Sequence, residues 1–225
     1  AASDVYKRQT TDCSSGRFCV LNGGTEYSST KVGGKVTHMN DKEFLQLLKR
    51  VHGSLRNKMM KDWKRDLPFE ELLFDRWERA TYLGFGKGSS IYHNSYVFGD
   101  VKVGENTWIG PFAILEGVGG ISIGDYCSIS SGVHIYTHDS VKWAVSGGRC
   151  RYERAPVKIG DCCYVGSYTV ITKGVEIGDH SVIGACSLVN KNIPPYSIVA
   201  GRPAKLVGKV IVKDKRDIRF AYRKK

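Results

Sequence analysis

One histidine of this sequence stands where a side chain that transfers protons would be useful. His138 opens residues 138–156, a long stretch that interrupts an otherwise regular repeat. A neutral imidazole has a pKa near ~6.5 and can take a proton from a hydroxyl group at neutral pH. Long excursions from repeat scaffolds usually carry function. We therefore interpret His138 as a general base, with a polar loop residue as the alternative.

Four further side chains near His138 are candidates for the same site. His134 precedes it by four residues, and we interpret it as a structural residue or a substrate contact. Asp139 could orient the imidazole, but adjacent residues rarely face each other, so solvent exposure is an equal alternative. Glu116 lies at an insertion one repeat earlier and is a candidate second polar group. Trp143, inside the interruption, is a candidate substrate contact.

A repeat with a period of six residues surrounds these candidates. Its aliphatic positions are Val97, Val103, Ile109, Leu115, Ile123, Ile129, Ile135, Ile159, Val165, Ile171, Ile177, Ile183 and Val189. This period is typical of a parallel β-helix, in which short strands form triangular coils that stack on one aliphatic column. Four residues after most of these positions the side chain is small and should also face inward. The glycines beside the aliphatic residues are interpreted as turn residues that tolerate a positive φ.

Two helical patterns precede the repeat. Asn40 or Asp41 can begin a helix whose apolar residues keep a spacing of three and four. Pro68 interrupts this pattern, and residues 69–82 are predicted to form a second helix. We expect both helices to cover the open end of the coil stack.

The chain is expected to divide into four regions. We interpret residues 1–38 as an irregular, non-native leader, with Met39 as the hypothesised native start. Residues 39–86 are predicted to form the helical cap, residues 87–205 the β-helix with loop 138–156, and residues 206–225 a basic tail.

Composition narrows the classes of function. The 225 residues are 41% hydrophobic and contain no apolar run of the roughly 20 residues that a membrane span needs. The formal net charge is +12, and the basic C-terminal end is interpreted as a solvated tail. We do not expect nucleic acid as a partner, and an anionic membrane surface is an alternative that we also do not expect. The seven cysteines form no CxxC pair, which favours a reducing cytoplasm and no metal.

The repeat, the loop and the closing segment, residues 193–205, together resemble the hexapeptide-repeat acyltransferases. The branch they resemble most contains the maltose, galactoside and xenobiotic acetyltransferases, and the resemblance covers about residues 85–210. It implies a left-handed parallel β-helix, a homotrimer, and a catalytic histidine at the start of the extended loop, which is His138 here. It also implies that the backbone N–H of Ser167 holds the oxyanion formed during acyl transfer.

The resemblance implies acetyl-CoA as the second substrate, bound in a groove between subunits. The positions that match the family's contacts with acetyl-CoA are Ser167, Ala185, Asn190, Lys191 and Lys205. The two lysines would supply the positive charge that the phosphates require. Arg202 is an added basic candidate.

The acceptor is expected to be a hydroxyl of a sugar or a cell-surface polysaccharide precursor. Specificity for galactoside or maltose is not carried over, because Gly110 falls where galactoside enzymes place a pocket asparagine. Two alternatives stay open. One is a zinc-dependent carbonic anhydrase that would use histidines from His93, His134, His138 and His180. The other is a non-catalytic β-helix scaffold.

Overall fold

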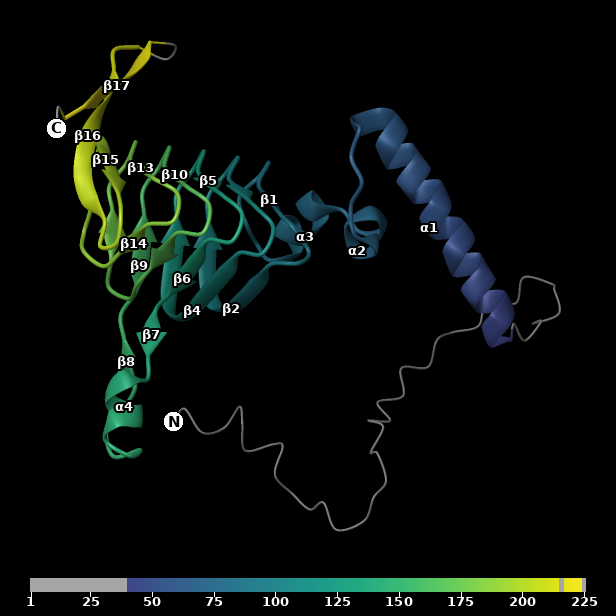
Figure 1. Ribbon diagram of the computed structural model, residues 1–225, viewed down its shortest axis with the longest axis horizontal. Helices are drawn as coiled ribbons and strands as arrows, with labels where there is room; N and C mark the ends of the chain where they lie inside the picture. The colour runs from purple at the N-terminus through teal and green to yellow at the C-terminus, as the bar shows by residue number, and fades with distance from the viewer. Residues whose placement is uncertain (1–39, 215–216, 224–225) are drawn as a thin grey trace. The chain divides into compact units, whose positions relative to one another are not determined.

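The computed structural model describes residues 40–214 and 217–223, and most of its strands form a parallel β-helix (Figure 1). The chain separates into two compact units, residues 1–43 and residues 44–225, and the β-helix belongs to the second. The expectations for residues 1–38 lie outside the described residues.

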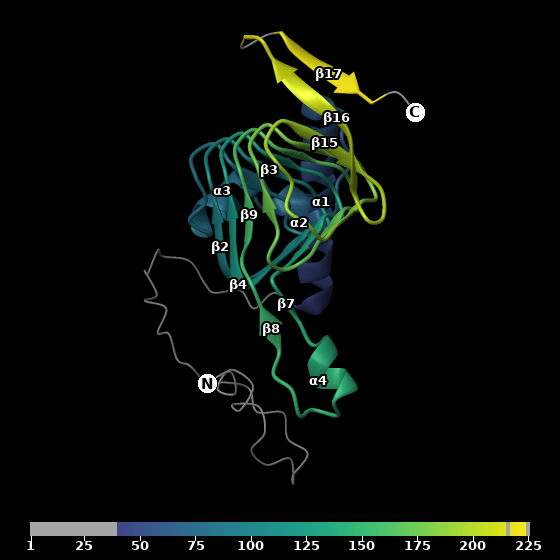
Figure 2. The ribbon, with the colours of Figure 1, turned by 90° about the vertical axis from the view of Figure 1, so that its left-hand side faces the viewer.

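The β-helix has three faces, and Figure 2 shows its coils stacked one behind another. Its strands are β1 (Ser90–Ile91), β2 (Tyr96–Val103), β3 (Trp108–Ile109), β4 (Ile114–Ile123), β5 (Ser128–Ile129), β6 (His134–Tyr136), β9 (Val157–Ile159), β10 (Tyr164–Val165), β11 (Val170–Ile171), β12 (Glu176–Ile177), β13 (Val182–Ile183), β14 (Leu188–Val189) and β15 (Ser197–Ala200). The first face has the order β1-β3-β5-β10-β13-β15. Strand β4 bends at a corner: its first half pairs with β6 on the second face, and its second half pairs with β9 on the third.

The aliphatic column predicted from the sequence is confirmed. Twelve of the thirteen aliphatic residues of the repeat are at most 6% exposed, and the thirteenth, Val97, is partly buried. The nine predicted small inward residues are at most 2% exposed: Thr107, Ala113, Cys127, Val133, Cys163, Thr169, Val175, Ser181 and Ser187. Each fully buried Val or Ile contributes roughly 1.5–3 kcal/mol of transfer free energy, so the column is the main source of stability.

The glycines beside the column do not turn the chain, contrary to the prediction. The positive φ angles fall two residues later, at Asn106, Tyr126, Cys162 and His180 among others. The glycines are required instead by close packing between coils. A Cβ on Gly160 would lie 2.0 Å from Asp179 Oδ1, and that oxygen accepts the Asp161 N–H at 2.9 Å.

The same aspartate contact recurs between neighbouring coils. Asp125 accepts the Glu105 N–H at 2.7 Å, and Asp161 accepts the Asp125 N–H at 2.8 Å. A Cβ on either preceding glycine, Gly104 or Gly124, would lie 2.1 Å from the accepting carboxylate oxygen. The repeated aliphatic-Gly-Asp pattern is therefore a contact between coils.

Three helices precede the coils: α1 (Asp41–Trp63), α2 (Phe69–Leu73) and α3 (Arg76–Tyr82). The predicted helix over residues 69–82 is broken, because the Asp75 side chain caps α3 by accepting the N–H groups of Trp77 and Glu78. Helix α3 packs at β1, where Arg79 donates to the Ser95 carbonyl at 2.8 Å. Helix α1 buries none of its residues, and its covering of the coil end stays a prediction. No helix of the described residues is long and apolar enough to cross a membrane.

Two segments leave the regular stack. The loop projects from the corner between the second and third faces and contains β7 (His138–Asp139), α4 (Val141–Val145) and β8 (Glu153–Arg154). At the C-terminal end, β16 (Lys205–Val212) pairs antiparallel with β15, and β17 (Ile218–Tyr222) pairs with β16. Strands β16 and β17 therefore form a largely exposed ribbon where an irregular solvated tail was predicted. Pairing with β15 of the last coil gives the backbone of β16 hydrogen-bond partners, which an isolated tail would lack.

Candidate active site

The corner at the end of the second face positions His138. On this face β6, β11 and β14 lie side by side, with Ile135, Ile171 and Val189 in register. The chain leaves β6 through Tyr136 and the fully buried Thr137, and then enters the loop at His138. The outward step at this corner leaves the His138 side chain 35% exposed.

Glu116 is the carboxylate that faces His138. It lies one coil earlier, in register with Tyr136, and its side chain is 9% exposed. The distance from His138 Nδ1 to Glu116 Oε2 is 2.6 Å. His138 Nδ1 has no hydrogen-bond partner among the described residues, so we treat the contact as an electrostatic one. Its attraction is greatest when the imidazole is protonated.

Glu116 is held as an anion. Burial acts to raise its pKa, but the contact with His138 and the hydrogen bonds from the Thr137 and Val118 N–H groups together lower it below its usual range. The Thr137 N–H donates to Oε2 at 3.0 Å, and the Val118 N–H donates to Oε1 at 3.0 Å. A carboxylate beside Nδ1 favours the tautomer with its proton on Nδ1, which leaves Nε2 as the basic nitrogen.

Asp139 faces away from the imidazole. Its carboxylate contacts Lys173 Nζ, and its Oδ1 accepts the Val141 N–H at 3.1 Å. The hydrogen bond from Lys173 lowers the pKa of Asp139, and the Val141 N–H adds to this effect. Glu116 therefore takes the orienting position that the sequence had left open for Asp139.

Aromatic rings of the loop lie beside His138. Tyr152 has its ring centroid 6.3 Å from that of His138, and Trp143 lies edge-to-face with Tyr152 at 5.5 Å. Tyr152 is 45% exposed and Trp143 is 43% exposed. His134 lies on the outer surface of β6, with its Nδ1 3.3 Å from the Tyr136 hydroxyl.

The residues matched to contacts with acetyl-CoA lie at both ends of the second face. Ser167 and Ala185 occupy stacked positions at its entry corner, where the Ser167 carbonyl accepts the Cys186 N–H at 2.8 Å. Within residues 40–214 and 217–223, the N–H groups of Ser167 and Ala185 have no hydrogen-bond acceptor. Arg202 joins this corner because its Nε donates to the Cys186 carbonyl at 2.7 Å.

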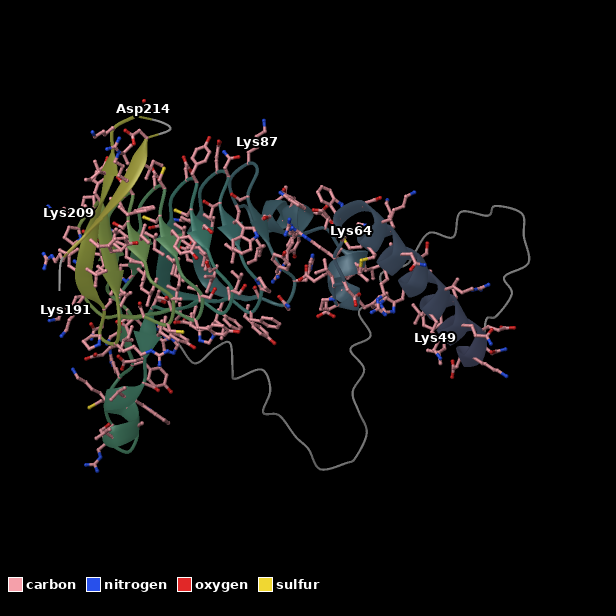
Figure 3. The ribbon with its side chains drawn as sticks, turned by 45° about the horizontal axis from the view of Figure 1, so that its top comes forward. Lys49, Lys64, Lys87, Lys191, Lys209 and Asp214 are labelled. Carbon is pink, nitrogen blue, oxygen red and sulfur yellow. The ribbon has the colours of Figure 1, made fainter. Side chains whose placement is uncertain are left out.

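The remaining matched residues are exposed. Asn190 and Lys191 follow β14 at the exit corner, two coils beyond the point where the loop leaves the same corner, and Figure 3 labels Lys191 at this end of the stack. Lys205 begins β16 opposite Ala200. Neither lysine has an ion-pair partner in the part of the chain that the structure describes.

The histidines considered for a zinc site contact different parts of the structure. His93 packs on Phe74, and His180 stacks on Tyr196 with ring centroids 4.9 Å apart. Among the described residues of one chain, no group of three or more His, Cys, Asp or Glu side chains is arranged to hold a metal ion.

Two cavities among the described residues lie away from His138. One of about 530 Å³ lies among α1, α2, α3 and Tyr92, and one of about 400 Å³ lies on the third face beside Lys158 and Glu176. His138 is 35% exposed, so chemistry there would take place at the surface of the single chain.

Three residues of the site were not singled out in the sequence: Thr137, Tyr152 and Lys173. Thr137 binds Glu116 through its Oγ1, which donates to the Glu116 carbonyl at 2.6 Å, and it accepts the Gly119 N–H at 2.7 Å. Its position just before His138, at the last inward step of the coil, was the available signal. Tyr152 and Lys173 carried no such signal, because their contacts depend on the path of the loop.

Comparisons with known proteins agree with the fold. Residues 156–191 match the bacterial transferase hexapeptide (six repeats) family, and residues 100–137 match the hexapeptide repeat of succinyl-transferase. The chain is 32% identical over 133 residues to the galactoside O-acetyltransferase of Escherichia coli (strain K12). This match covers 50% of the chain and 66% of that enzyme, just under two thirds of its length.

Two further proteins extend the likeness. The chloramphenicol acetyltransferase of Morganella morganii is 34% identical over 162 residues, which cover 64% of this chain and 75% of that enzyme. The crystal structure of a hexapeptide-repeat-containing acetyltransferase from Vibrio cholerae is similar with a TM-score of 0.54 and 25% identity, over 74% of this chain and 92% of that one. With the coils, the loop and these matches in agreement, the chain belongs to the hexapeptide-repeat acetyltransferase family.

Proposed function

We propose that this protein transfers an acetyl group from acetyl-CoA to a hydroxyl of a sugar or a cell-surface polysaccharide precursor, with His138 as the general base. The observation that carries the proposal is the 2.6 Å contact between His138 Nδ1 and the buried Glu116 carboxylate. A histidine held in this way has one nitrogen fixed and the other free to exchange protons. Membership of the acetyltransferase family supports the reaction class.

His138 would move one proton twice. Acetyl-CoA supplies the thioester, whose carbonyl carbon takes the acceptor oxygen and whose sulfur leaves as a thiolate. Nε2 takes the proton of the attacking hydroxyl, which makes the imidazole a cation, and the Glu116 carboxylate stabilises that cation. Nε2 then returns the proton to the departing sulfur. The residue ends neutral, so no covalent enzyme intermediate is needed.

Backbone and basic groups at the ends of the second face fit the acetyl donor. The Ser167 N–H, which has no acceptor within the described residues, would donate to the oxyanion that develops on the carbonyl oxygen. The Ala185 N–H lies one coil further along the same corner and would bind the amide-containing arm of the donor. Lys191, Lys205 and Arg202 would bind its phosphates, since exposed cations without carboxylate partners attract such groups.

The acceptor would lie against the loop. Tyr152 and Trp143 present half-exposed rings beside His138, and a sugar ring can pack its apolar face on such surfaces. Galactoside or maltose is not proposed as the acceptor, because the pocket asparagine of galactoside enzymes has no equivalent at Gly110.

We further propose that the protein works as a homotrimer. Flat faces of a β-helix can pack around a threefold axis, and closed symmetric assembly is the usual state of such proteins. The open surface around His138 in the single chain would become a groove when a second subunit covers it. Size-exclusion chromatography with light scattering should give three times the mass of the chain, and a monomer that turns over substrate would contradict this part of the proposal.

Thiol release from acetyl-CoA over a panel of sugars and surface polysaccharides tests the activity. Wild type should release thiol only when an acceptor is present, and His138→Ala should lower kcat by roughly 10²- to 10⁴-fold. The matched control is His180→Ala, which removes a histidine of the same solenoid that stacks on Tyr196. Equal losses in both variants would remove His138 from the mechanism. No release and no saturable binding of acetyl-CoA by wild type would contradict the activity itself.

A further inference from the structure

The loop that carries His138 is closed at its base by a very short ribbon. Strands β7 and β8 pair antiparallel over two residues each, with His138 opposite Arg154 and Asp139 opposite Glu153. The Ala155 N–H also donates to the Thr137 carbonyl at 2.9 Å. A two-stranded ribbon of this length is not stable by itself in water. Other contacts must therefore fix the base of the loop.

The ribbon also brings two carboxylates opposite each other. Asp139 and Glu153 are partners across the strands, and like charges in this position repel. Lys173 lies between them: its Nζ contacts Asp139 Oδ2 and is 3.1 Å from Glu153 Oε2. Lys142, inside the loop, makes a second contact with Glu153. Lys173 is the member of this cluster that belongs to the solenoid.

Lys173 is placed for this contact by the coil stack. It follows β11, whose Ile171 is in register with Ile135 of β6, so Lys173 stands at the corner one coil beyond the start of the loop. Its side chain is 25% exposed, so most of it is covered by neighbouring residues. The next residue, Gly174, has a φ of +78° and turns the chain away toward β12.

Successive residues of β7 are held from opposite sides. Side chains along a strand point alternately to its two faces, so Asp139 faces Lys173 while His138 faces Glu116. We propose that Lys173 is a positioning residue, which neutralises the two carboxylates at the base of the loop and thereby holds His138 Nδ1 against Glu116. This inference rests on the proposed function only in assigning the chemistry to His138.

Three variants separate this role from a general effect on folding. Lys173→Met keeps the length of the stem and removes the charge, whereas Lys173→Arg keeps a cation that can reach two carboxylates. The matched control is Lys158→Met. It removes a lysine of the third face that pairs with Glu176 at 3.0 Å, away from the loop.

Two measurements need no turnover. Hydrogen exchange of the peptide that covers residues 140–155 should become about tenfold faster in Lys173→Met. Without the lysine cation, Asp139 and Glu153 repel each other and the base of the loop opens more often. The rate at which diethyl pyrocarbonate modifies His138, followed by mass spectrometry with His180 as internal reference, should rise severalfold in the same protein. Lys173→Arg and Lys158→Met should keep the wild-type rates. Unchanged rates in Lys173→Met would overturn the proposal.

Steady-state kinetics then tests positioning directly. Lys173→Met should lower kcat about tenfold and leave the KM for acetyl-CoA within twofold, because Ser167 and Ala185 at the entry corner and the Lys191 cation on the next coil are unchanged. Lys173→Arg should recover most of kcat. Faster exchange with an unchanged kcat would show that Lys173 closes the loop without positioning His138, and would overturn the proposal. A wild type without turnover would contradict the proposed function, and the two rates above would still decide the role of Lys173.

Discussion

Glu116 and His138 belong to consecutive coils and meet at 2.6 Å, although 22 positions separate them in the sequence. The parallel register makes this possible, because Glu116 is the partner of Tyr136 and His138 follows two residues later. The carboxylate also accepts the backbone N–H groups of Thr137 and Val118, so it is fixed before the histidine contacts it.

Replacement of Glu116 by Gln should impair catalysis more than binding. The two N–H groups bind different carboxylate oxygens, so the single amide oxygen of Gln can accept only one of them, and the amide carries no charge to stabilise a protonated His138. We expect kcat to fall roughly 10- to 100-fold, as for other groups that orient a functional histidine, with the KM for acetyl-CoA unchanged. Initial-rate kinetics measures both, with Glu176→Gln on the third face as control. A variant with wild-type kcat would show that the charge of Glu116 is not used.

Acid should remove the stability that Glu116 supplies. Its pKa is lower in the folded protein than the ordinary value of about 4.3, so the contribution is fully present above that value and is lost as the pH falls through the folded pKa. The difference in melting temperature between wild type and Glu116→Gln should therefore be larger at pH 7 than at pH 3. Thermal unfolding at fixed protein concentration measures it, and a difference that does not change with pH would contradict the prediction.

Gly160→Ala should destabilise the coil stack. The added Cβ would lie 2.0 Å from Asp179 Oδ1, which would have to move and release the Asp161 N–H. We expect a loss of about 1–3 kcal/mol in the free energy of unfolding, measured with urea. Gly53→Ala is the matched control: it lies inside α1 with no atom within 4 Å of the new Cβ. Alanine there should stabilise by roughly 0.5–1 kcal/mol. Equal effects at both sites would refute the role of the coil contact.

The loop aromatics should affect the acceptor and leave the donor unaffected. Trp143→Ala or Tyr152→Ala removes a ring worth about 0.5–1.5 kcal/mol to a packed partner, so the acceptor KM should rise roughly two- to tenfold. The KM for acetyl-CoA should stay the same. The control is Tyr82→Ala, which removes an aromatic side chain that is 90% exposed at the end of α3. A rise in the donor KM would place these rings in the donor site.

The coils were predictable from the sequence because their period is set by the inward side chains alone. Ile171 or Val189 is buried whatever surrounds the solenoid, so a count of six locates each one. The role of Gly160 was not predictable in the same way. Its need for a missing Cβ comes from Asp179 on the next coil, and only the stacking distance reveals it.

The site was predictable where it follows the repeat, and unpredictable where it follows the loop. Glu116 could be named as a candidate because an insertion marks the corner at which it lies. Lys173 looked like any solvated corner lysine, since its partners Asp139 and Glu153 reach it only through the path of the loop. The break at Asp75 was hidden because a side-chain cap can restart a helix inside an unbroken apolar pattern.

The pairing of β7 with β8 returns the chain to the coil stack at the place where it left. The distance between the ends of the excursion is therefore fixed by this pairing together with the contacts of Lys173 to Asp139 and Glu153, whatever the length of the segment between Ser140 and Tyr152. Enzymes of this architecture could replace that segment by one of different sequence and length, and so use new acceptors, without any change in the aliphatic column. Grafting a relative's loop onto these two strands would be a direct route to altered specificity.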